Sequence, residues 1–554
     1  MEIANFKKLL VLICPILLNC NNEDQVIKNR APKAFEIDVT EISFSSTKIN
    51  WTESLDPEGS IVFYDVYLTS NKLADNITDL SFDFNNLIEG KTYEGKVVAS
   101  DPEGNTLEKN FSFETSLNQL PTQFITTVVS VNPYHPKIVW STSTDPEGGS
   151  IKYKVYLNDE LKVETNQQEF TFESLKGLNF YNGYVEAIDE DGKVRVSNFS
   201  FTTEIKIYNS DLFLENQAEV DDFGLEGFNL IEGNLVIGSL NSLNDISSLE
   251  GLHDVQSVQG NVYIRNTACQ NLMGLHNISQ LNQFVELIIV NNRYLERVDG
   301  LNSIENVYRI YIETNEKLLN LDGLSNLKSA TKSIGIVNNQ SLNSIIGLAN
   351  VSILGEIQIL NNDSLTSLIG LEGVNSISRE VHIYKNKNLQ TIQGLDNLIY
   401  AGELIISDNE SLTNLNNLSN LEGGVSIRII NNDQLLSLSG LEKLKAINHT
   451  MIIANNDNLE TLSGIENVLF TDNNANYHAL GISGNPKITN LDPLENYTFN
   501  KGPISIFDNS TLTDFCGLTK IINEIEEFTN YYNFATNNAY NPSMQDILDG
   551  NCFL

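Results

Sequence analysis

The last three-fifths of the chain repeats one pattern of apolar and polar positions, with a step of 23 or 24 residues in almost every repeat. In the stretch IQILNNDSLTSLIGLEGV (357–374), apolar residues alternate before Asn362 and are then spaced by three up to the pair Gly370-Leu371. Alternation predicts a β-strand, and its loss after the asparagine predicts a bend. A sustained period of this length predicts a solenoid in which each repeat forms one coil.

An asparagine lies eight residues before the Gly-Leu pair, or before a variant of it, in every coil except the first. A carboxamide that points inward can bond to backbone groups at the bend and to the asparagine of the next coil. We therefore interpret the asparagines as a structural ladder and not as an active motif. Its predicted members are Asn266, Asn292, Asn315, Asn339, Asn362, Asn386, Asn409, Asn432, Asn456, Asn485 and Asn509.

Residues 34–204 alternate over shorter runs and contain an internal repeat. The segment INWTESLDPEGSIVFYDVYL (49–68) returns as IVWSTSTDPEGGSIKYKVYL (138–157). Short alternating runs separated by turn residues predict antiparallel strands. We therefore expect two β-sandwiches, with Trp51 and Trp140 in their cores.

The two repeats resemble fibronectin type III domains. A leucine stands six residues before a tyrosine in each repeat, as Leu87 before Tyr93 and Leu175 before Tyr181. This spacing is similar to that of the tyrosine corner of such sandwiches. Neither repeat contains a cysteine pair, which disfavours a disulfide-linked immunoglobulin domain.

The solenoid resembles two related repeat families. Its strand segment LGEIQILNN (354–362) matches the leucine-rich repeat pattern, and the spacing that follows looks more like the receptor L-domain. Residues 216–238 resemble the start of such modules, which implies a short capping helix. The C-terminal segment departs from the period and predicts a second cap, closed by a disulfide between Cys516 and Cys552. Cys269 replaces a leucine of other coils and is predicted to be a buried core residue.

The N-terminal stretch MEIANFKKLLVLICPILLNC has two lysines before an apolar run that is too short to span a bilayer. Its end, LLNC, resembles the lipobox of bacterial lipoproteins, which implies acylation of Cys20 and stable membrane anchoring. An ordinary signal peptide with an incidental cysteine is the alternative. The acidic residues Glu23 and Asp24 resemble the surface-export signal of Bacteroidetes lipoproteins. We therefore expect an outer-membrane lipoprotein exposed at the cell surface.

These observations predict an all-β dominated fold of two fibronectin type III sandwiches followed by a leucine-rich, β-helix-like solenoid with capping helices. The expected divisions are a lipoprotein signal peptide (1–19), a lipidated cysteine with its linker (20–33), the two sandwiches (34–116 and 117–204) and the solenoid with both caps (205–554).

The chain is strongly acidic, with a formal net charge of −38 and a pI near 4.4. This argues against a nucleic-acid partner, because binding phosphates requires basic patches. Acidic loops recur in both sandwiches and offer oxygen ligands for Ca²⁺. The preferred interpretation is that Asp-Pro-Glu-Gly forms a β-turn, so no cofactor is predicted and structural Ca²⁺ stays as the alternative. The candidate ligands are Asp56, Glu58, Asp101, Glu103, Asp145, Glu147, Asp189 and Asp191.

The sequence contains no Ser/His/Asp set, zinc spacing or phosphate loop that indicates catalysis. Asp299 and Asp322 are the obvious pair for glycoside hydrolysis, but each precedes a Gly-Leu turn and is interpreted as a solvated corner residue. His382 and His449 are isolated in the sequence. We therefore predict that the protein is not an enzyme.

A binding surface is better supported. Side chains four and two residues before the ladder asparagine should point outward from the sheet, and aromatic residues and arginine dominate interface energies. Acids one step earlier (Glu286, Glu356, Glu380 and Glu403) should form an electronegative edge. The alternative is that this face only packs its own cross-strand neighbours. The candidate binding residues are Ile288, Tyr311, His382, Tyr384, Arg428, Ile430 and Phe507.

The sequence thus predicts a non-catalytic surface lipoprotein that binds an extracellular protein or glycan through the solenoid sheet, with the sandwiches as spacers. Contact with the membrane is expected through the lipid anchor only. The alternative functions are glycan capture or processing in polysaccharide uptake, and a purely structural spacer.

Overall fold

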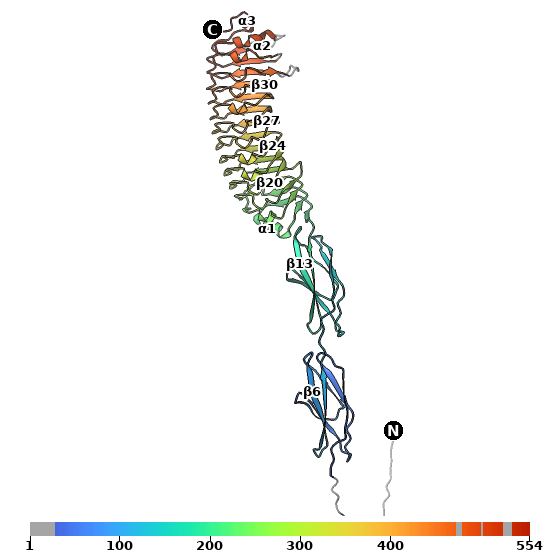
Figure 1. The fold of residues 1–554 in the computed structure, drawn as a ribbon. Helices are drawn as coiled ribbons and strands as arrows, with labels where there is room; N and C mark the ends of the chain where they lie inside the picture. Colours follow the sequence, from blue (N-terminus) through green and yellow to red (C-terminus); the bar gives the residue numbers. More distant parts are fainter. Residues whose placement is uncertain (1–27, 472–478, 500–501, 525–533) are drawn as a thin grey trace, which may run out of the picture.

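A computed structural model describes residues 28–471, 479–499, 502–524 and 534–554. The predicted signal peptide, the lipidation site Cys20 and the acidic residues Glu23 and Asp24 lie outside the described residues. Two sandwiches and a long solenoid follow one another in a line, and the C-terminus lies at the far end of the solenoid (Figure 1). No helix in these ranges is long and apolar enough to cross a membrane.

The first sandwich consists of two antiparallel sheets. One sheet contains β1 (Ile37–Thr40), β2 (Thr47–Trp51) and β5 (Ser81–Phe84). The other has the order β4 (Asn71–Ile77), β3 (Phe63–Leu68), β6 (Thr92–Ser100) and β7 (Thr106–Glu114). Alternate residues of β2 and β3 are buried, and the rings of Trp51 and Tyr64 lie 5.5 Å apart in the core.

The second sandwich repeats this topology. Its smaller sheet contains β12 (Glu169–Thr171), β9 (Lys137–Trp140) and β8 (Thr126–Ser130). Its larger sheet has the order β11 (Glu160–Thr165), β10 (Lys152–Leu157), β13 (Phe180–Ile188) and β14 (Val194–Thr202). Trp140 packs on Tyr153 at 5.6 Å, which matches the pair in the first sandwich.

Both sandwiches have the predicted tyrosine corner. The Tyr93 hydroxyl accepts the backbone N–H of Ile88 at 2.8 Å, and the Tyr181 hydroxyl accepts that of Lys176 at 3.1 Å. Leu87 and Leu175 pack beside the two cores. A tyrosine hydroxyl that bonds back to the upstream backbone is a mark of this sandwich type, so the predicted fold of residues 34–204 is confirmed.

The solenoid has about 12 turns and is built from parallel strands. A short sheet contains β15 (Ile207–Tyr208), β17 (Leu230–Ile231), β19 (Ser257–Val258) and β21 (Gln280–Leu281). The long sheet contains β16 (Leu212–Leu214), β18 (Leu235–Ile237), β20 (Val262–Arg265), β22 (Glu286–Val290), β23 (Asn306–Glu313), β24 (Ser329–Val337), β25 (Ile353–Leu354), β26 (Ile357–Leu360), β27 (Ser376–Tyr384), β28 (Tyr400–Ser407), β29 (Gly423–Ile430), β30 (Ala446–Ala454), β31 (Leu469–Phe470), β32 (Ala479–Ser483), β33 (Ile504–Phe507) and β34 (Ala535–Thr536).

The asparagine ladder closes the backbone at the bend after each strand. The N–H of Asn362 donates to Oδ1 of Asn386 at 3.1 Å, and its Nδ2 donates to the carbonyl oxygens of Ile336 at 2.9 Å and Leu360 at 3.0 Å. Buried backbone groups need such partners. The ladder continues through Asn509 to Asn538, which the sequence pattern missed because the last segment leaves the period.

The ladder prediction is wrong at Asn266. This residue has a left-handed φ of 54° and occupies the corner before the buried position. Thr267 fills the buried position instead, where its N–H and Oγ1 donate to Oδ1 of Asn292 at 3.0 and 2.8 Å. In this coil the buried position, Thr267, lies seven residues before Gly274, whereas at the other predicted ladder positions it lies eight residues before the glycine or the residue that replaces it. Counting back eight residues from Gly274 therefore reaches the corner residue Asn266.

The Gly-Leu pair brings neighbouring coils into close contact. A Cβ on Gly300 would lie 1.9 Å from the carbonyl oxygen of Leu272, and one on Gly323 would lie 2.1 Å from that of Val298. Gly300 has a φ of 111°, whereas Gly323 lies in a 3₁₀ helix. The 3₁₀ turns are η1 (Glu250–Leu252), η2 (Asp322–Leu324), η3 (Ile346–Leu348), η4 (Asn416–Leu418), η5 (Asp492–Leu494) and η6 (Cys516–Leu518).

Both ends of the solenoid are capped. Helix α1 (Gln217–Glu226) begins after β16, so the first coil starts before the predicted capping helix. At the other end are α2 (Thr519–Glu524) and α3 (Met544–Leu548), and a disulfide joins Cys516 to Cys552. Caps of this kind cover apolar area and strand edges that a terminal coil would expose.

Cys269 is buried and free, as expected for a core position. Burial raises the pKa of its thiol to about 11. The thiol is therefore protonated near neutral pH and is a poor nucleophile.

Candidate ligand-binding surface

The candidate binding residues lie in two adjacent rows on the outer face of the long sheet. Residues at the same position on successive parallel strands form straight rows with a step of about 4.8 Å. One row runs through Tyr263, Ile288, Tyr311, Gly335, Gln358, His382, Ile405, Arg428, Ile452 and Gly481. The next runs through Arg265, Val290, Glu313, Val337, Leu360, Tyr384, Ser407, Ile430, Ala454, Ser483 and Phe507.

These side chains point away from the core. Tyr311, Tyr384 and Arg428 are half-buried, and Phe507 is 40% exposed. The residues between them on each strand, such as Ile312 and Ile383, are fully buried. The period-two pattern therefore predicted correctly which side chains face outward.

Two candidate residues have local partners on the sheet. Nδ1 of His382 lies 3.2 Å from a carboxylate oxygen of Glu380, and its ring lies 5.5 Å from that of Tyr384. Nη1 of Arg428 donates to Glu403 at 3.4 Å. His382 is thus isolated in the sequence but not in the structure.

The predicted electronegative edge is interrupted by cations from other coils. Glu286 pairs with Lys332 at 2.8 Å, and Glu356 lies 3.8 Å from Arg379. Glu403 pairs with Arg428, as noted above. The fold therefore has no uniform acidic edge at these glutamates. Basic residues from the neighbouring strand, or from two coils away, lie beside them and offset their charge.

Several surface residues near β20 to β24 were missed by sequence reasoning. Tyr263 stands four residues before Thr267, which fills the buried position, so counting back from the predicted Asn266 reaches the buried Val262 instead. Tyr308 and Lys332 were missed because the pairing of β23 with β24 shifts register between Val307 and Arg309. A bulge of this kind re-aims side chains and leaves no simple signal in the sequence.

A polar groove of about 380 Å³ follows the bend beside the ladder. Burial, and then the carboxylates of Asp457 and Glu410, raises the pKa of Asp433 in this groove. The lining residues directly precede or follow ladder asparagines, where the sequence pattern alone marks only the bend. They are Asn361, Asp363, Lys385, Lys387, Asp408, Glu410, Asn431 and Asp433.

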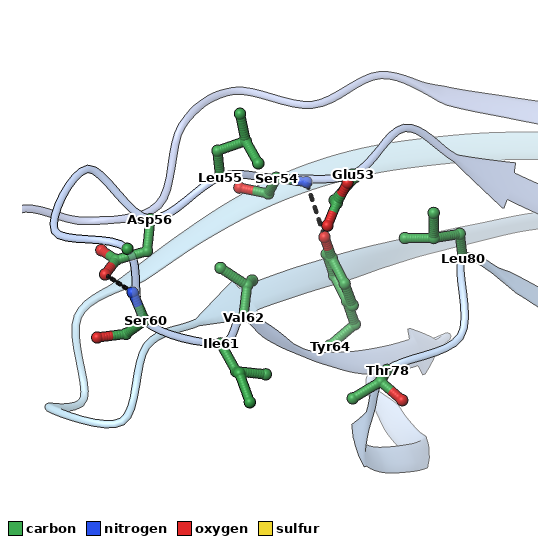
Figure 2. Close-up of a pocket in the computed structure, with 11 residues that line it drawn as sticks. Glu53, Ser54, Leu55, Asp56, Ser60, Ile61, Val62, Tyr64, Thr78 and Leu80 are labelled. Atoms are coloured by element: carbon green, nitrogen blue, oxygen red, sulfur yellow. Dashed lines mark hydrogen bonds between the residues drawn. The ribbon is translucent and has the colours of Figure 1, made fainter. Parts of the chain in front are cut away.

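The first sandwich has a pocket of about 380 Å³ beside its first acidic loop (Figure 2). The Tyr64 hydroxyl accepts the N–H of Ser54 at 2.7 Å, and a carboxylate oxygen of Asp56 accepts that of Ser60 at 2.6 Å. Leu55 and Ile61 line the pocket and remain exposed. These hydrogen bonds hold the loop on the sandwich, and the pocket beside it is lined by polar and apolar residues alike.

The four acidic loops are turns, as preferred from the sequence. In each turn the glycine N–H donates to the carbonyl oxygen of the aspartate three residues earlier, for example Gly148 to Asp145 at 3.0 Å. The glycines have φ between 87° and 94°. The N–H groups of Glu147 and Gly149 donate to the Asp145 carboxylate and hold its pKa below the ordinary value. The equivalent turns are Gly59 to Asp56, Gly104 to Asp101 and Gly192 to Asp189.

The remaining acidic side chains of these loops do not gather into a metal site. Glu58 pairs with Arg30 at 3.0 Å. Within the described residues, the one convergent group of three metal-binding side chains is Asp514 with Cys516 and Cys552, and both cysteines are in the disulfide. Glu103, Glu147 and Asp191 therefore lie on the sandwich surface without two further acidic ligands beside them.

The two aspartates considered for glycoside hydrolysis occupy equivalent corners of neighbouring coils. Asp299 lies 3.2 Å from Nε of Arg297, and Asp322 is exposed at the start of η2. Their surroundings are those of corner residues.

The fibronectin type III domain family matches residues 30–115, which contain the first sandwich. No curated protein matches the chain in sequence. Among solved structures, the fibronectin(III)-like modules of CbhA from Clostridium thermocellum are 15% identical and cover 31% of this chain and 94% of their own, with a TM-score of 0.17. A two-domain fibronectin type III segment of chicken tenascin is 13% identical and covers 31% of this chain and 100% of its own, with a TM-score of 0.16.

Proposed function

We propose that this protein is a non-catalytic surface lipoprotein whose solenoid sheet binds an extracellular protein or glycan. One observation carries the proposal: half-exposed aromatic, aliphatic and arginine side chains stand at several positions of two straight, adjacent rows on the outer face of the sheet. These are the residue types that anchor interfaces. The rows contain Ile288, Tyr311, His382, Tyr384, Arg428, Ile430 and Phe507.

The other parts of the chain serve this surface. The solenoid acts as a receptor L-domain-like or leucine-rich recognition module, and the two sandwiches hold it away from the membrane. Acylated Cys20 anchors the chain in the outer membrane, where the acidic residues after it direct the protein to the outer face.

The binding role is tested with the double variant Tyr311→Ala/Tyr384→Ala in the full mature chain. We expect a ligand found on glycan or extracellular-protein arrays to lose most of its binding, because both rings stand in the proposed surface. Tyr294→Ala is the matched control, since Tyr294 is also exposed but follows the bend. Unchanged binding by the double variant would refute the assignment.

The anchor is tested separately. Cys20→Ser should release the protein from the membrane fraction, and protease shaving of intact cells should remove the solenoid from the native protein. Full protection from the protease would place the protein inside the cell envelope.

Glycan processing is the second candidate, favoured by the groove at the bend. Glycoside hydrolysis needs a carboxylic acid whose pKa is raised, and Asp433 meets this condition. Turnover of a polysaccharide that Asp433→Asn abolishes would establish an enzyme. Binding without turnover favours the first proposal.

A further inference from the structure

The outer face between β20 and β24 carries a basic–aromatic patch in an otherwise acidic protein. Each of its cations lies beside an aromatic ring. Arg309 is 4.8 Å from the ring centre of Tyr311, Arg265 is 5.8 Å from that of Tyr263, and Lys332 is 5.1 Å from that of Tyr308. The patch consists of Tyr263, Arg265, Tyr308, Arg309, Tyr311 and Lys332.

The Tyr311 ring has a fixed place on this face. It lies across Gly335 on the next strand, where an added Cβ would come within 2.3 Å of the ring. Gly335 has an ordinary strand φ, so its backbone conformation does not require glycine. The absence of a side chain at this position instead makes room for the Tyr311 ring. The sheet is therefore shaped to hold one aromatic ring against its outer surface.

The two arginines of the patch have hydrogen-bond capacity that the protein does not use. Nε of Arg265 and Nε of Arg309 are buried without an acceptor. Among the described residues, no carboxylate lies within 4.0 Å of the Arg265 guanidinium, whereas Nη1 of Arg309 lies 3.8 Å from a carboxylate oxygen of Glu286. A buried donor without an acceptor is costly, and each such case in a native fold calls for an explanation.

We propose that the basic–aromatic patch binds the uronate groups of an acidic polysaccharide that runs along the rows of the sheet. This inference rests on the proposed binding function and names its ligand class. A uronate has a ring with an apolar C–H face that can stack on tyrosine, and a carboxylate that can pair with the half-exposed guanidinium of an arginine. An acidic peptide side chain supplies the carboxylate but no ring.

The repeat of the patch suits a polymer. The Tyr263–Arg265 pair lies on β20 and the Arg309–Tyr311 pair on β23, with β22 between them. Two strand steps separate the pairs by about 9.6 Å. A chain that carries uronates at intervals can engage both pairs at once, so that the second contact forms at high effective concentration.

The net charge of −38 does not prevent such binding. At physiological ionic strength the Debye length is about 8 Å, so distant carboxylates are largely screened. Within the patch, Glu286 pairs with Lys332 and lies near Arg309, whereas the Arg265 guanidinium has no carboxylate partner among the described residues. Arg265 therefore gives a polyanion its first contact in this part of the sheet.

The test uses the full mature chain and surface-immobilised polygalacturonate or alginate at 0.15 M NaCl. We expect binding to at least one of these polyuronates, with about ten-fold or greater weakening in Arg265→Gln/Arg309→Gln, because charge-assisted hydrogen bonds are lost. Arg379→Gln is the matched control, since Arg379 is an exposed arginine on β27 outside the patch. Methyl-esterified polygalacturonate and poly-glutamate should bind much more weakly than the polyuronates.

A second variant pair isolates the role of the ring. Gly335→Ala should displace Tyr311 and weaken polyuronate binding, whereas Gly481→Ala should not. Gly481 stands in the same row, but its added Cβ meets nothing closer than 3.6 Å. Circular dichroism and melting temperature verify that both variants fold.

The outcomes separate this inference from the proposed function. Failure of both polyuronates, equal binding of the esterified polymer or of poly-glutamate, or equal effects of Gly335→Ala and Gly481→Ala would overturn the inference. If another ligand then still depends on Tyr311 and Tyr384, the proposed function stands. If no ligand depends on the sheet, both fall.

Discussion

The two junctions between the domains differ in burial. Between the sandwiches, Lys193 pairs with Glu89 at 2.8 Å, and more than a third of each side chain is exposed. Between the second sandwich and the solenoid, Lys206 is 1% exposed and donates to Ser174 Oγ at 2.7 Å and to the carbonyl oxygen of Glu226 at 2.6 Å. The first contact is a surface ion pair, whereas the second is part of a core.

The second junction is also closely packed around Lys206. Its ammonium lies 4.8 Å from the ring centre of Phe228, and Asn229 accepts the Lys206 N–H at 3.0 Å. A Cβ on Gly177 would lie 2.0 Å from Oδ1 of Asn229. The second sandwich therefore works as part of the N-terminal cap of the solenoid, while the first is joined by a contact that solvent can replace.

Lys206→Ala should have the largest effect, because it removes the donor to three acceptor atoms on Ser174 and Glu226 and leaves a cavity at a buried site. We expect the solenoid and second sandwich to lose about 2–4 kcal/mol of unfolding free energy. Urea unfolding of the full chain measures this loss, and proteolysis should begin near residue 205. Lys193→Ala is the control. Equal effects of the two variants would contradict the difference between the junctions.

Asn362→Leu should have the next largest effect. It leaves the N–H of Asn339 and the carbonyl oxygens of Ile336 and Leu360 without their side-chain partner. We expect a loss of about 1–3 kcal/mol in all, because the Leu360 oxygen still accepts the N–H of Asn338. If the second sandwich is part of the cap, its unfolding should shift together with that of the solenoid. The first sandwich should keep its own transition, as followed by calorimetry. Independent unfolding of the second sandwich would show that its junction does not couple the two.

Lys193→Ala should leave the melting temperature unchanged, because exposed ion pairs add little to stability. It should instead widen the distribution of angles between the two sandwiches, as measured by small-angle X-ray scattering. Adding 1 M NaCl to the native protein should have a similar effect through screening. A rigid pair of sandwiches in the variant would show that other contacts, such as Arg195 to the Pro121 carbonyl oxygen, fix the angle.

The smallest effect is a pH dependence confined to the first junction. The hydrogen bond from Lys193 lowers the pKa of Glu89 below its usual value of 4.5. A depressed folded-state pKa means that the contact contributes fully above the unfolded pKa and is lost as pH falls through the folded pKa. Fluorescence transfer between labels on the sandwiches should therefore report loosening below about pH 4.5. The Lys193→Ala variant should show no such change.

Sequence reasoning was most accurate where structure depends on local spacing. The burial of Trp51, the tyrosine corner at Tyr93 and the hydrogen bonds of Asn362 all follow from residues whose positions repeat. It failed at Asn266, because this coil has one residue fewer before its glycine, and the predicted ladder position therefore fell on the corner residue and not on the buried Thr267. It also missed Tyr308 and Lys332, since a register shift re-aims them.

The repeat in the sequence determined which side chains face inward, where each coil bends and which residues form the outer rows, because strand and bend geometry depend on near neighbours. Only the tertiary structure decided how those rows are charged and how the domains are joined. Lys332 reaches Glu286 across 46 residues, and Lys193 reaches Glu89 across 104. Whether such pairs meet depends on how the coils and domains stack, and local spacing does not contain that information.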